Sequence, residues 1–206
     1  MFRSIPPVTR ALIIANVAIF GAQLLLGDRF VVAFALWPLG SASVLGPESG
    51  AGFNLWQLVT YAFLHGNSLH LFFNMFALYM FGGEIERTIG SRRFVQYWFA
   101  AVVTAAITQL VVSAVTQGPP YPTIGASGGV FGVLLAFGLF FPNRILVLLI
   151  PPIPMPAWLF VTLYGAIELF LGVSGTQAGV AHFAHLGGML GGWLLLRYWR
   201  AKRPRY

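Results

Sequence analysis

The most informative stretch of this chain runs from Gly125 to Phe141 and reads GASGGVFGVLLAFGLFF. It carries no charged side chain, and a serine flanked by glycines stands near its start. A run this apolar predicts a helix at membrane depth. A later run, Ala184 to Gly188, reads AHLGG and places an imidazole on another apolar stretch. If the two helices pack together, a hydroxyl and an imidazole can meet as a nucleophile and its base.

The composition is that of a polytopic membrane protein with almost nothing outside the bilayer. Of the 206 residues, 58% are hydrophobic and 8% are charged, whereas soluble domains carry roughly 25% charged residues. Cysteine is absent, which excludes disulfide and thiolate chemistry. The formal net charge of +7 could suggest nucleic acid as a partner. The basic residues are instead placed as membrane orientation signals, so we expect no nucleic-acid partner.

Six segments are apolar enough to be predicted as membrane spans, each needing about 20 mostly apolar residues. They are residues 8–26, 68–83, 94–115, 127–141, 156–172 and 182–199. The second and fourth are short, and the run 145–150, closed by two prolines, is the main ambiguity in this count. We therefore expect an all-α polytopic membrane protein, one six-helix bundle spanning residues 1–206 with no soluble domain.

The basic residues give the predicted spans an orientation. With six spans, every lysine and arginine except Arg29 falls on one face of the membrane. Basic residues accumulate on the cytoplasmic side, so both termini are expected there. The basic C-terminal tail is expected to contact anionic lipid headgroups. A cleavable signal peptide is not expected, because the first apolar run lacks a small-residue cleavage site.

The first loop, residues 28–57, is long and itself apolar, with aromatic residues that include Trp37 and Trp56. Tryptophan prefers the level of the lipid headgroups, so we expect this loop in the outer interface. Two interpretations stay open at this point. The loop could bend the local bilayer or frame a substrate entrance, or it could serve as an interfacial anchor only.

His70 and Asn74 stand four residues apart on the second predicted span and therefore share one helical face. Both side chains can donate hydrogen bonds. Pointed at one spot, they could stabilise the anion that develops when a carbonyl is attacked. The alternative is that they join helices through hydrogen bonds, as polar side chains in membranes often do.

Ser127 follows a proline-rich segment and stands where the fourth span should begin. Its backbone N–H is then one of the unpaired donors at a helix start, where the helix dipole also favours negative charge. An oxyanion formed on Ser127 would therefore meet a donor. A small serine in a glycine-rich helix is also explained by close packing alone.

Glycines repeat four apart on both candidate helices, Gly128 and Gly132 on one, Gly188 and Gly192 on the other. Small residues at this spacing let helix backbones approach closely in membranes. Each pair lies beside one of the two candidate residues, so packing of these faces would bring the hydroxyl and the imidazole together.

The chain has four histidines, His65, His70, His182 and His185, which raises the question of a metal site. No His-Glu-x-x-His pattern occurs and no acid is near a histidine in sequence, so we expect neither a metal nor a cofactor. Glu168 is the one acid inside a predicted span. Because no acid is placed to orient His185, a Ser-His dyad with packing around the imidazole is expected. The roles of His65, His182 and Glu168 stay open.

With these motifs in order, nearly the whole chain resembles the rhomboid intramembrane serine proteases. The motifs that carry the resemblance are HGNSLHLFFN at 65–74, GGEIERTIGS at 82–91, GASG at 125–128 and AHLGGMLGG at 184–192.

The resemblance implies Ser127 as nucleophile and His185 as general base. It implies an oxyanion hole made by the Ser127 backbone N–H with the side chains of His70 and Asn74, and a loop shaped by Gly125. It further implies transmembrane substrates cut near the outer leaflet, lipid as the surrounding partner and a bacterial plasma membrane as the location.

Two positions depart from the pattern of the resemblance. Gln57 follows Trp56 where some relatives have arginine, and Phe131 stands where some have tyrosine. A non-catalytic rhomboid-like protein that binds membrane helices is the alternative, and the intact Ser127 and His185 disfavour it. A small channel or transporter would want repeated halves, and the chain shows no convincing internal repeat.

Overall fold

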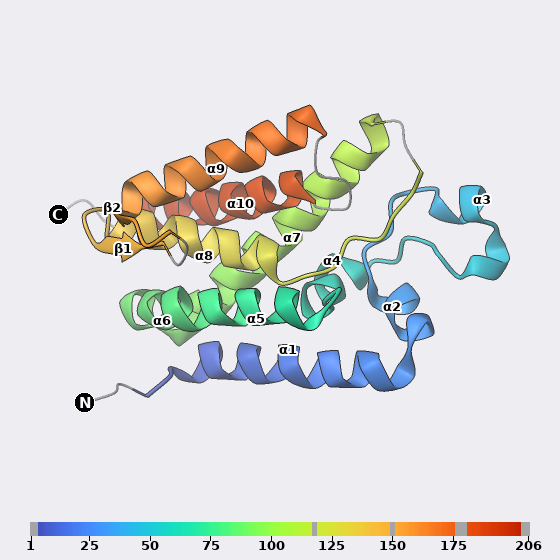
Figure 1. Ribbon diagram of the computed structural model, residues 1–206, viewed down its shortest axis with the longest axis horizontal. Coiled ribbons are helices and arrows are strands. Elements are labelled where there is room, and N and C mark those ends of the chain that lie inside the picture. Colours follow the sequence, from blue (N-terminus) through green and yellow to red (C-terminus); the bar gives the residue numbers. More distant parts are fainter. Residues whose placement is uncertain (1–3, 117–118, 149–150, 176–180, 203–206) are drawn as a thin grey trace.

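The computed structural model describes residues 4–116, 119–148, 151–175 and 181–202. These residues fold into a bundle of membrane-type helices (Figure 1), which confirms the predicted fold class. Its main helices are α1 (Pro7–Leu26), α5 (Ser68–Ala77), α6 (Gly83–Ile89), α7 (Ser91–Val115), α8 (Ser127–Phe140), α9 (Ala157–Ser174) and α10 (His182–Ala201). A π-helical turn, η3 (Leu78–Gly82), joins α5 to α6, so residues 68–89 form one continuous helical segment.

By length and composition, three of the described helices could cross a membrane: α1, α7 and α9. The helix α8 is apolar but shorter, with 14 residues. The histidines, glycines and arginines of α10 lower its mean hydropathy. Glycines therefore recur on both helices that carry the predicted nucleophile and base, and polar residues are added on α10.

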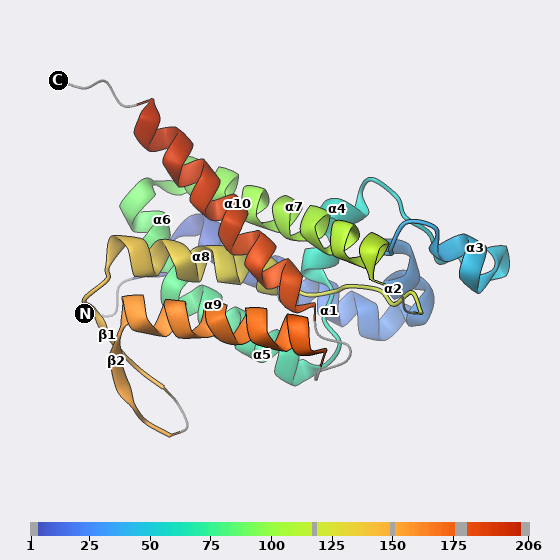
Figure 2. The ribbon, with the colours of Figure 1, turned by 90° about the horizontal axis from the view of Figure 1, so that it is seen from above.

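In the bundle, α8 lies in the middle (Figure 1) and packs against α7, α9 and α10. The helix α10 also packs against α7 and crosses it at an angle (Figure 2). The start of α1 and the end of α10 lie at one end of the bundle, whereas α2 (Asp28–Phe34) and α3 (Ser41–Leu45) lie at the other (Figures 1 and 2).

The first loop contains more helix than its composition predicted. Besides α2 and α3 it holds a 3-10 turn, η1 (Pro47–Ser49), and it leads into α4 (Gln57–Thr60) and η2 (Tyr61–Phe63). Within it Trp37 is buried and Trp56 is half exposed. Both indole N–H groups donate to backbone carbonyls of the same loop, those of Val32 and Ala33. These hydrogen bonds hold the loop together internally, while some of its apolar side chains remain exposed.

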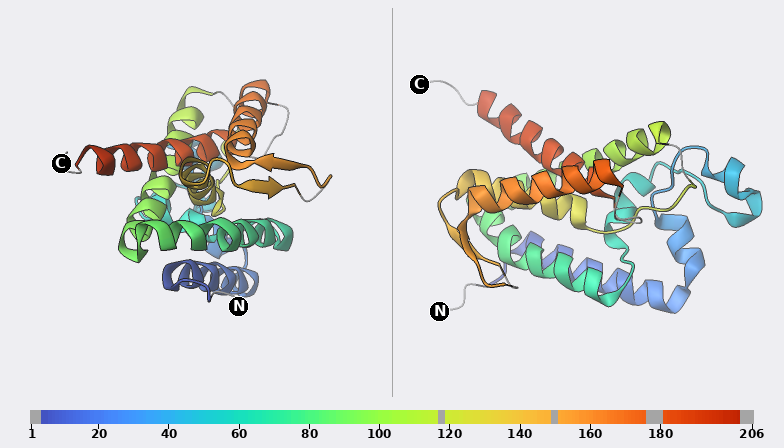
Figure 3. Two further views of the ribbon diagram at one scale, coloured as in Figure 1. Left: turned by 90° about the vertical axis from the view of Figure 1, so that its left-hand side faces the viewer. Right: turned by 45° about the horizontal axis from the view of Figure 1, so that its top comes forward.

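The ambiguous run at 145–150 is not a helix over its described part. Residues Ile145–Val147 form β1, which pairs antiparallel with β2 (Pro154–Pro156). The prolines that follow the run cannot continue a helix, and the chain turns back instead. This hairpin projects from the helices in the left view of Figure 3.

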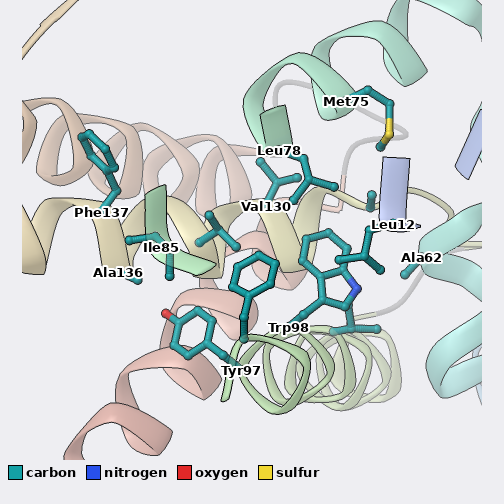
Figure 4. Close-up of a cluster of buried hydrophobic side chains, with 14 of the residues drawn as sticks. Leu12, Ala62, Met75, Leu78, Ile85, Tyr97, Trp98, Val130, Ala136 and Phe137 are labelled. Atoms are coloured by element: carbon teal, nitrogen blue, oxygen red, sulfur yellow. The ribbon is translucent and has the colours of Figure 1, made fainter. Parts of the chain in front are cut away.

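The hydrophobic core joins α7 to α8 and to the segment 68–89. Tyr97 and Trp98 of α7 are fully buried, and they contact Val130 of α8 and Leu78 of η3 through the same cluster (Figure 4). Because α7 contributes its large aromatic residues here, it serves as the support on which α8 is placed.

One buried acid fastens the start of α1 to the rest of the bundle. The carboxylate of Glu86 accepts hydrogen bonds from the backbone N–H groups of Val8 and Thr9 at 3.0 and 2.7 Å. It also accepts from the hydroxyls of Thr9 and Ser91 at 2.8 and 2.7 Å. Free N–H groups at a helix start need such acceptors when they are buried.

Candidate active site

Ser127 is the first residue of α8, and this end of α8 points toward the side of the bundle that carries α2 and α3 (Figure 1). At 1.5 Å per residue, α8 with 14 residues is about 21 Å long and α7 with 25 residues is about 38 Å long. The chain reaches α8 through the segment 119–126, which is fixed by paired backbone bonds between Thr123 and Leu36 at 3.0 and 2.9 Å. The N–H of Gly125 also donates to the Tyr61 carbonyl at 2.9 Å.

The structure brings the predicted hydroxyl and imidazole together. The Oγ atom of Ser127 lies 2.7 Å from Nε2 of His185, although 58 residues separate them in sequence. His185 lies in the first turn of α10, beside the first turn of α8. This distance is that of a hydrogen bond between a nucleophile and a base.

Close approach of two glycines produces this geometry. A Cβ added at Gly188 would overlap the carbonyl oxygen of Gly128, so the backbones of α10 and α8 are in direct contact. Gly132 also lies against α10, with its Cβ position 3.1 Å from the Gly188 carbonyl oxygen. The predicted packing of α8 on α10 through small residues is therefore correct at these positions.

The prediction is wrong for Gly192, which faces α7. A Cβ at Gly192 would overlap the hydroxyl of Tyr97, and that hydroxyl donates to the Gly132 carbonyl at 2.6 Å. The phenol therefore sits between the second glycines of the two helices. Gly132 and Gly192 each lie four residues after a glycine at the α8–α10 contact, but the Tyr97 side chain of α7 separates them.

Phe131, one turn after Ser127, packs flat on the imidazole of His185. The ring centroids are 4.3 Å apart and the planes differ by 4°. Phe131, noted above at a position where some relatives have tyrosine, therefore packs on His185 with a ring that carries no hydroxyl. The stacking restricts the imidazole to one plane.

An acid lies behind the imidazole, which corrects the expectation that none is placed there. Nδ1 of His185 is 2.8 Å from Oε2 of Glu168, and Nδ1 of His182 is 2.7 Å from the same oxygen. Glu168 belongs to α9, and packing of α9 against α10 brings it to His185 although 17 residues separate the two in sequence. A signal was present in the sequence, since two histidines three apart share a helical face and can meet one acid.

The same three residues have the composition of a metal site. Their possible ligand atoms lie within 4.8 Å of one another, which the sequence spacing did not lead us to expect. Both Nδ1 atoms already lie at hydrogen-bond distance from one carboxylate oxygen. Two imidazole N–H groups donating to a carboxylate explain the cluster as fully as a cation would.

His70 lies beside Ser127 because residue 125 has no side chain. Gly125 has φ +125°, and a Cβ there would lie 2.8 Å from Cε1 and Nε2 of His70 and 3.7 Å from Oγ of Ser127. Nδ1 of His70 accepts from the backbone N–H of Gly66 at 3.4 Å. That bond leaves the ring proton on Nε2, the nitrogen next to the Ser127 loop.

Asn74 is buried one turn further along α5, where its amide nitrogen donates to the His70 carbonyl at 3.0 Å. An amide nitrogen carries two N–H groups, so this bond leaves one for another acceptor. His65 lies nearby, fully buried, with its ring 5.0 Å from that of His70. Its backbone is held by the side chain of Gln23 on α1, at 3.1 and 2.7 Å.

Gln57, at the position where arginine was noted in some relatives, is buried and holds the first loop. Its Oε1 accepts from the backbone N–H of Trp37 at 3.2 Å and of Asn54 at 3.3 Å. Its Nε2 donates to the Gly52 carbonyl at 2.9 Å. A neutral amide therefore organises this loop by hydrogen bonds to its backbone.

Comparison with known proteins identifies the family to which this chain is similar. Residues 52–202 match the family described as Rhomboid domain. Rhomboid protease GluP of Bacillus subtilis (strain 168) is 33% identical over 138 residues, which cover 66% of this chain and 24% of that protein. Rhomboid protease GlpG of Yersinia pestis (strain Pestoides F) is 27% identical over 196 residues, covering 94% of this chain and 62% of the relative.

A eukaryotic relative covers this chain completely. Rhomboid protein 1, mitochondrial, of Saccharomyces cerevisiae is 28% identical over 232 residues, 100% of this chain and 61% of that protein. The chain thus spans between about a quarter and three fifths of the length of these relatives.

Proposed function

The chain belongs to the rhomboid family, and on that basis we propose that it is an intramembrane serine endopeptidase. The observation that carries the proposal is the 2.7 Å contact between Oγ of Ser127 and Nε2 of His185. The contact lies at the start of the short helix α8, which packs among α7, α9 and α10.

Ser127 is the nucleophile. As Oγ attacks the scissile carbonyl carbon, its proton passes to Nε2 of His185 and the carbonyl electron pair becomes an oxyanion. The backbone N–H of Ser127, at the positive end of α8, donates to that oxyanion. The Nε2–H of His70 and the remaining N–H of Asn74 are the two further donors.

When the oxyanion collapses, the bond to the leaving amine breaks and His185 returns the proton to that amine. A water molecule then attacks the acyl-enzyme by the same route, with His185 as base, and releases the second product. Water must reach Ser127 for this step. The site therefore needs access from the aqueous side nearest α2 and α3.

The substrates are transmembrane helices whose peptide bond is cleaved near the outer leaflet. An intact helix hides its backbone carbonyls in hydrogen bonds, so residues that weaken the helix near the scissile bond will be preferred. The cytoplasmic face is the one bearing the start of α1 and the end of α10, where the basic residues concentrate. We place the protein in a bacterial plasma membrane, with lipid as its surrounding partner.

The test is cleavage of a transmembrane substrate by the purified protein in liposomes. Wild type is expected to cut the substrate and Ser127→Ala to leave it intact while still folded. Ser43→Ala serves as a control, because Ser43 is an exposed first-loop residue that donates to the Gly40 carbonyl. Cleavage by purified Ser127→Ala would refute the proposal. A wild type that binds the helix but never cuts it would favour the non-catalytic rhomboid-like alternative.

A further inference from the structure

Glu168 is a carboxylate on an otherwise apolar membrane-type helix, α9, with an exposed fraction of 9%. A charge in such a place is costly and needs partners. Its partners are the two Nδ1 atoms of His185 and His182, at 2.8 and 2.7 Å from the single oxygen Oε2. The placement gives a buried anion two hydrogen-bond donors from the neighbouring helix.

A carboxylate oxygen can only accept, so Nδ1 of His185 must carry a proton to make this bond. In the neutral ring the other nitrogen, Nε2, is then without a proton and presents its lone pair. Nε2 is the atom that lies 2.7 Å from Oγ of Ser127. The contact with Glu168 therefore selects the tautomer that a general base needs.

The orientation of the imidazole is fixed at the same time. Phe131 covers one face of the ring at a centroid distance of 4.3 Å, and Glu168 holds its far edge. His182, one turn before His185 on α10, holds the same carboxylate oxygen and is itself buried. A carboxylate held by two donors has little freedom to turn away from His185.

Building on the proposed function, we propose that Glu168 is a positioning residue for the reaction, so that this chain works with a Ser127-His185-Glu168 arrangement. Glu168 touches neither the substrate nor Oγ. When Nε2 takes the proton from Ser127, the ring becomes a cation that retains its Nδ1–H bond to the carboxylate. When Nε2 gives that proton to the leaving amine, the starting state returns. Glu168 stays ionised throughout and stabilises the cation between the two transfers.

A purely structural role predicts something else. If Glu168 only fastens α9 to α10, its loss should lower stability and affect every kinetic parameter through unfolding. A positioning residue acts on turnover, because the substrate contacts Ser127 and not Glu168. The two roles are therefore separated by kcat, KM and stability measured on the same samples.

The decisive variant is Glu168→Gln, which keeps the shape of the side chain and removes its charge. With a transmembrane substrate in liposomes we expect kcat to fall about 100-fold and KM to stay within about twofold. Glu168→Asp restores a carboxylate on a shorter stem and should recover part of the turnover.

Two other variants are matched controls. Thr162→Val changes an exposed residue of α9 whose hydroxyl donates to its own helix at Trp158, and should leave kcat unchanged. His182→Leu removes the other donor to Oε2 while leaving the His185 contact in place. The fold loss of kcat in His182→Leu should be at least about tenfold smaller than the fold loss in Glu168→Gln. Equal losses of kcat in His182→Leu and Glu168→Gln would overturn the proposal. So would a wild-type kcat in folded Glu168→Gln.

A spectroscopic measurement keeps the proposal testable if Glu168→Gln fails to fold. The chain has four histidines, so 15N-histidine labelling gives few imidazole signals, assigned by single substitutions. In wild type at neutral to mildly alkaline pH, His185 should be in its Nδ1–H tautomer. Finding its Nε2–H tautomer instead would overturn the proposal.

The same samples separate this proposal from the proposed function. If wild type cleaves the substrate and Glu168→Gln cleaves equally well, only the role of Glu168 fails. If wild type does not cleave and has no serine reactive toward a fluorophosphonate, the proposed function fails with it.

Discussion

The ring of Phe131 lies parallel to the imidazole of His185, with 4.3 Å between centroids and 4° between planes. Phe131 lies on α8, the helix that also carries Ser127, and His185 lies on α10. The aromatic ring therefore links the orientation of the His185 imidazole to the helix that carries Ser127.

Replacing Phe131 by alanine should slow the enzyme without unfolding it. The imidazole of His185 would lose the ring that holds its orientation, and a misoriented base lowers kcat. We expect kcat to fall by about tenfold to 100-fold. Phe131→Tyr keeps the ring and should stay near wild type. Kinetics of both variants on a transmembrane substrate check this, and a wild-type kcat for Phe131→Ala would contradict it.

Gly125→Ala should lower kcat strongly by displacing His70. The new Cβ would lie 2.8 Å from the His70 ring. The backbone there has a φ of +125°, which residues with a side chain rarely adopt. Loss of one oxyanion donor is expected to lower kcat at least about 100-fold.

Gly27→Ala is the matched control for Gly125→Ala. It too has a positive φ, +69°, but open space where its Cβ would lie. It should lower the thermal midpoint slightly and keep kcat. Equal turnover by the two variants would show that His70 does not depend on the missing side chain.

Gly188→Ala should destabilise the protein, because its Cβ would overlap the Gly128 carbonyl oxygen and force α10 from α8. We expect a loss of about 3 kcal/mol or more. Gly165→Ala, on α9, would place its Cβ 3.7 Å from the flexible Met189 side chain and should change stability by no more than about 1 kcal/mol. Thermal unfolding in detergent measures both, and equal stability of the two variants would contradict the packing described.

Acid should loosen the start of α1 through Glu86, which lies beyond the predicted second span. Burial acts to raise the pKa of Glu86, but hydrogen bonds from Ser91, Thr9 and Val8 outweigh it and hold the pKa below its ordinary value. A depressed folded-state pKa stabilises the fold above the unfolded value and loses that contribution as the pH falls through the folded value.

The stability of wild type should therefore decline below about pH 4, where free glutamate titrates. Glu86→Gln cannot titrate, so it should be less stable at neutral pH and show a flatter acid decline. Thermal midpoints across the pH range test this. Parallel curves for wild type and Glu86→Gln would show that Glu86 does not contribute to the acid response.

Local motifs predicted the parts of the site that depend on neighbouring helices packing through glycine. Ser127 and His185 each stand beside small residues, so their meeting followed from the sequence, and the structure places the two atoms 2.7 Å apart. The His70 ring likewise lies where a helix face and Gly125 direct it.

The parts that the sequence missed depend on a third helix. Glu168 reaches His185 only because α9 packs against α10, and no spacing along the chain encodes which face α9 turns inward. Gly192 meets Tyr97 of α7 for the same reason. The β hairpin was missed because its apolar run has the composition of a helix, while the prolines after it direct the chain back.

The proposed role of Ser127 as nucleophile is tested most directly by locating the covalent adduct that a fluorophosphonate forms with the purified protein. Peptide mass spectrometry of wild type should find the adduct on Ser127, and His185→Ala should form it far more slowly. Labelling at another residue, or undiminished labelling of folded Ser127→Ala, would contradict the assignment of this pair as nucleophile and base.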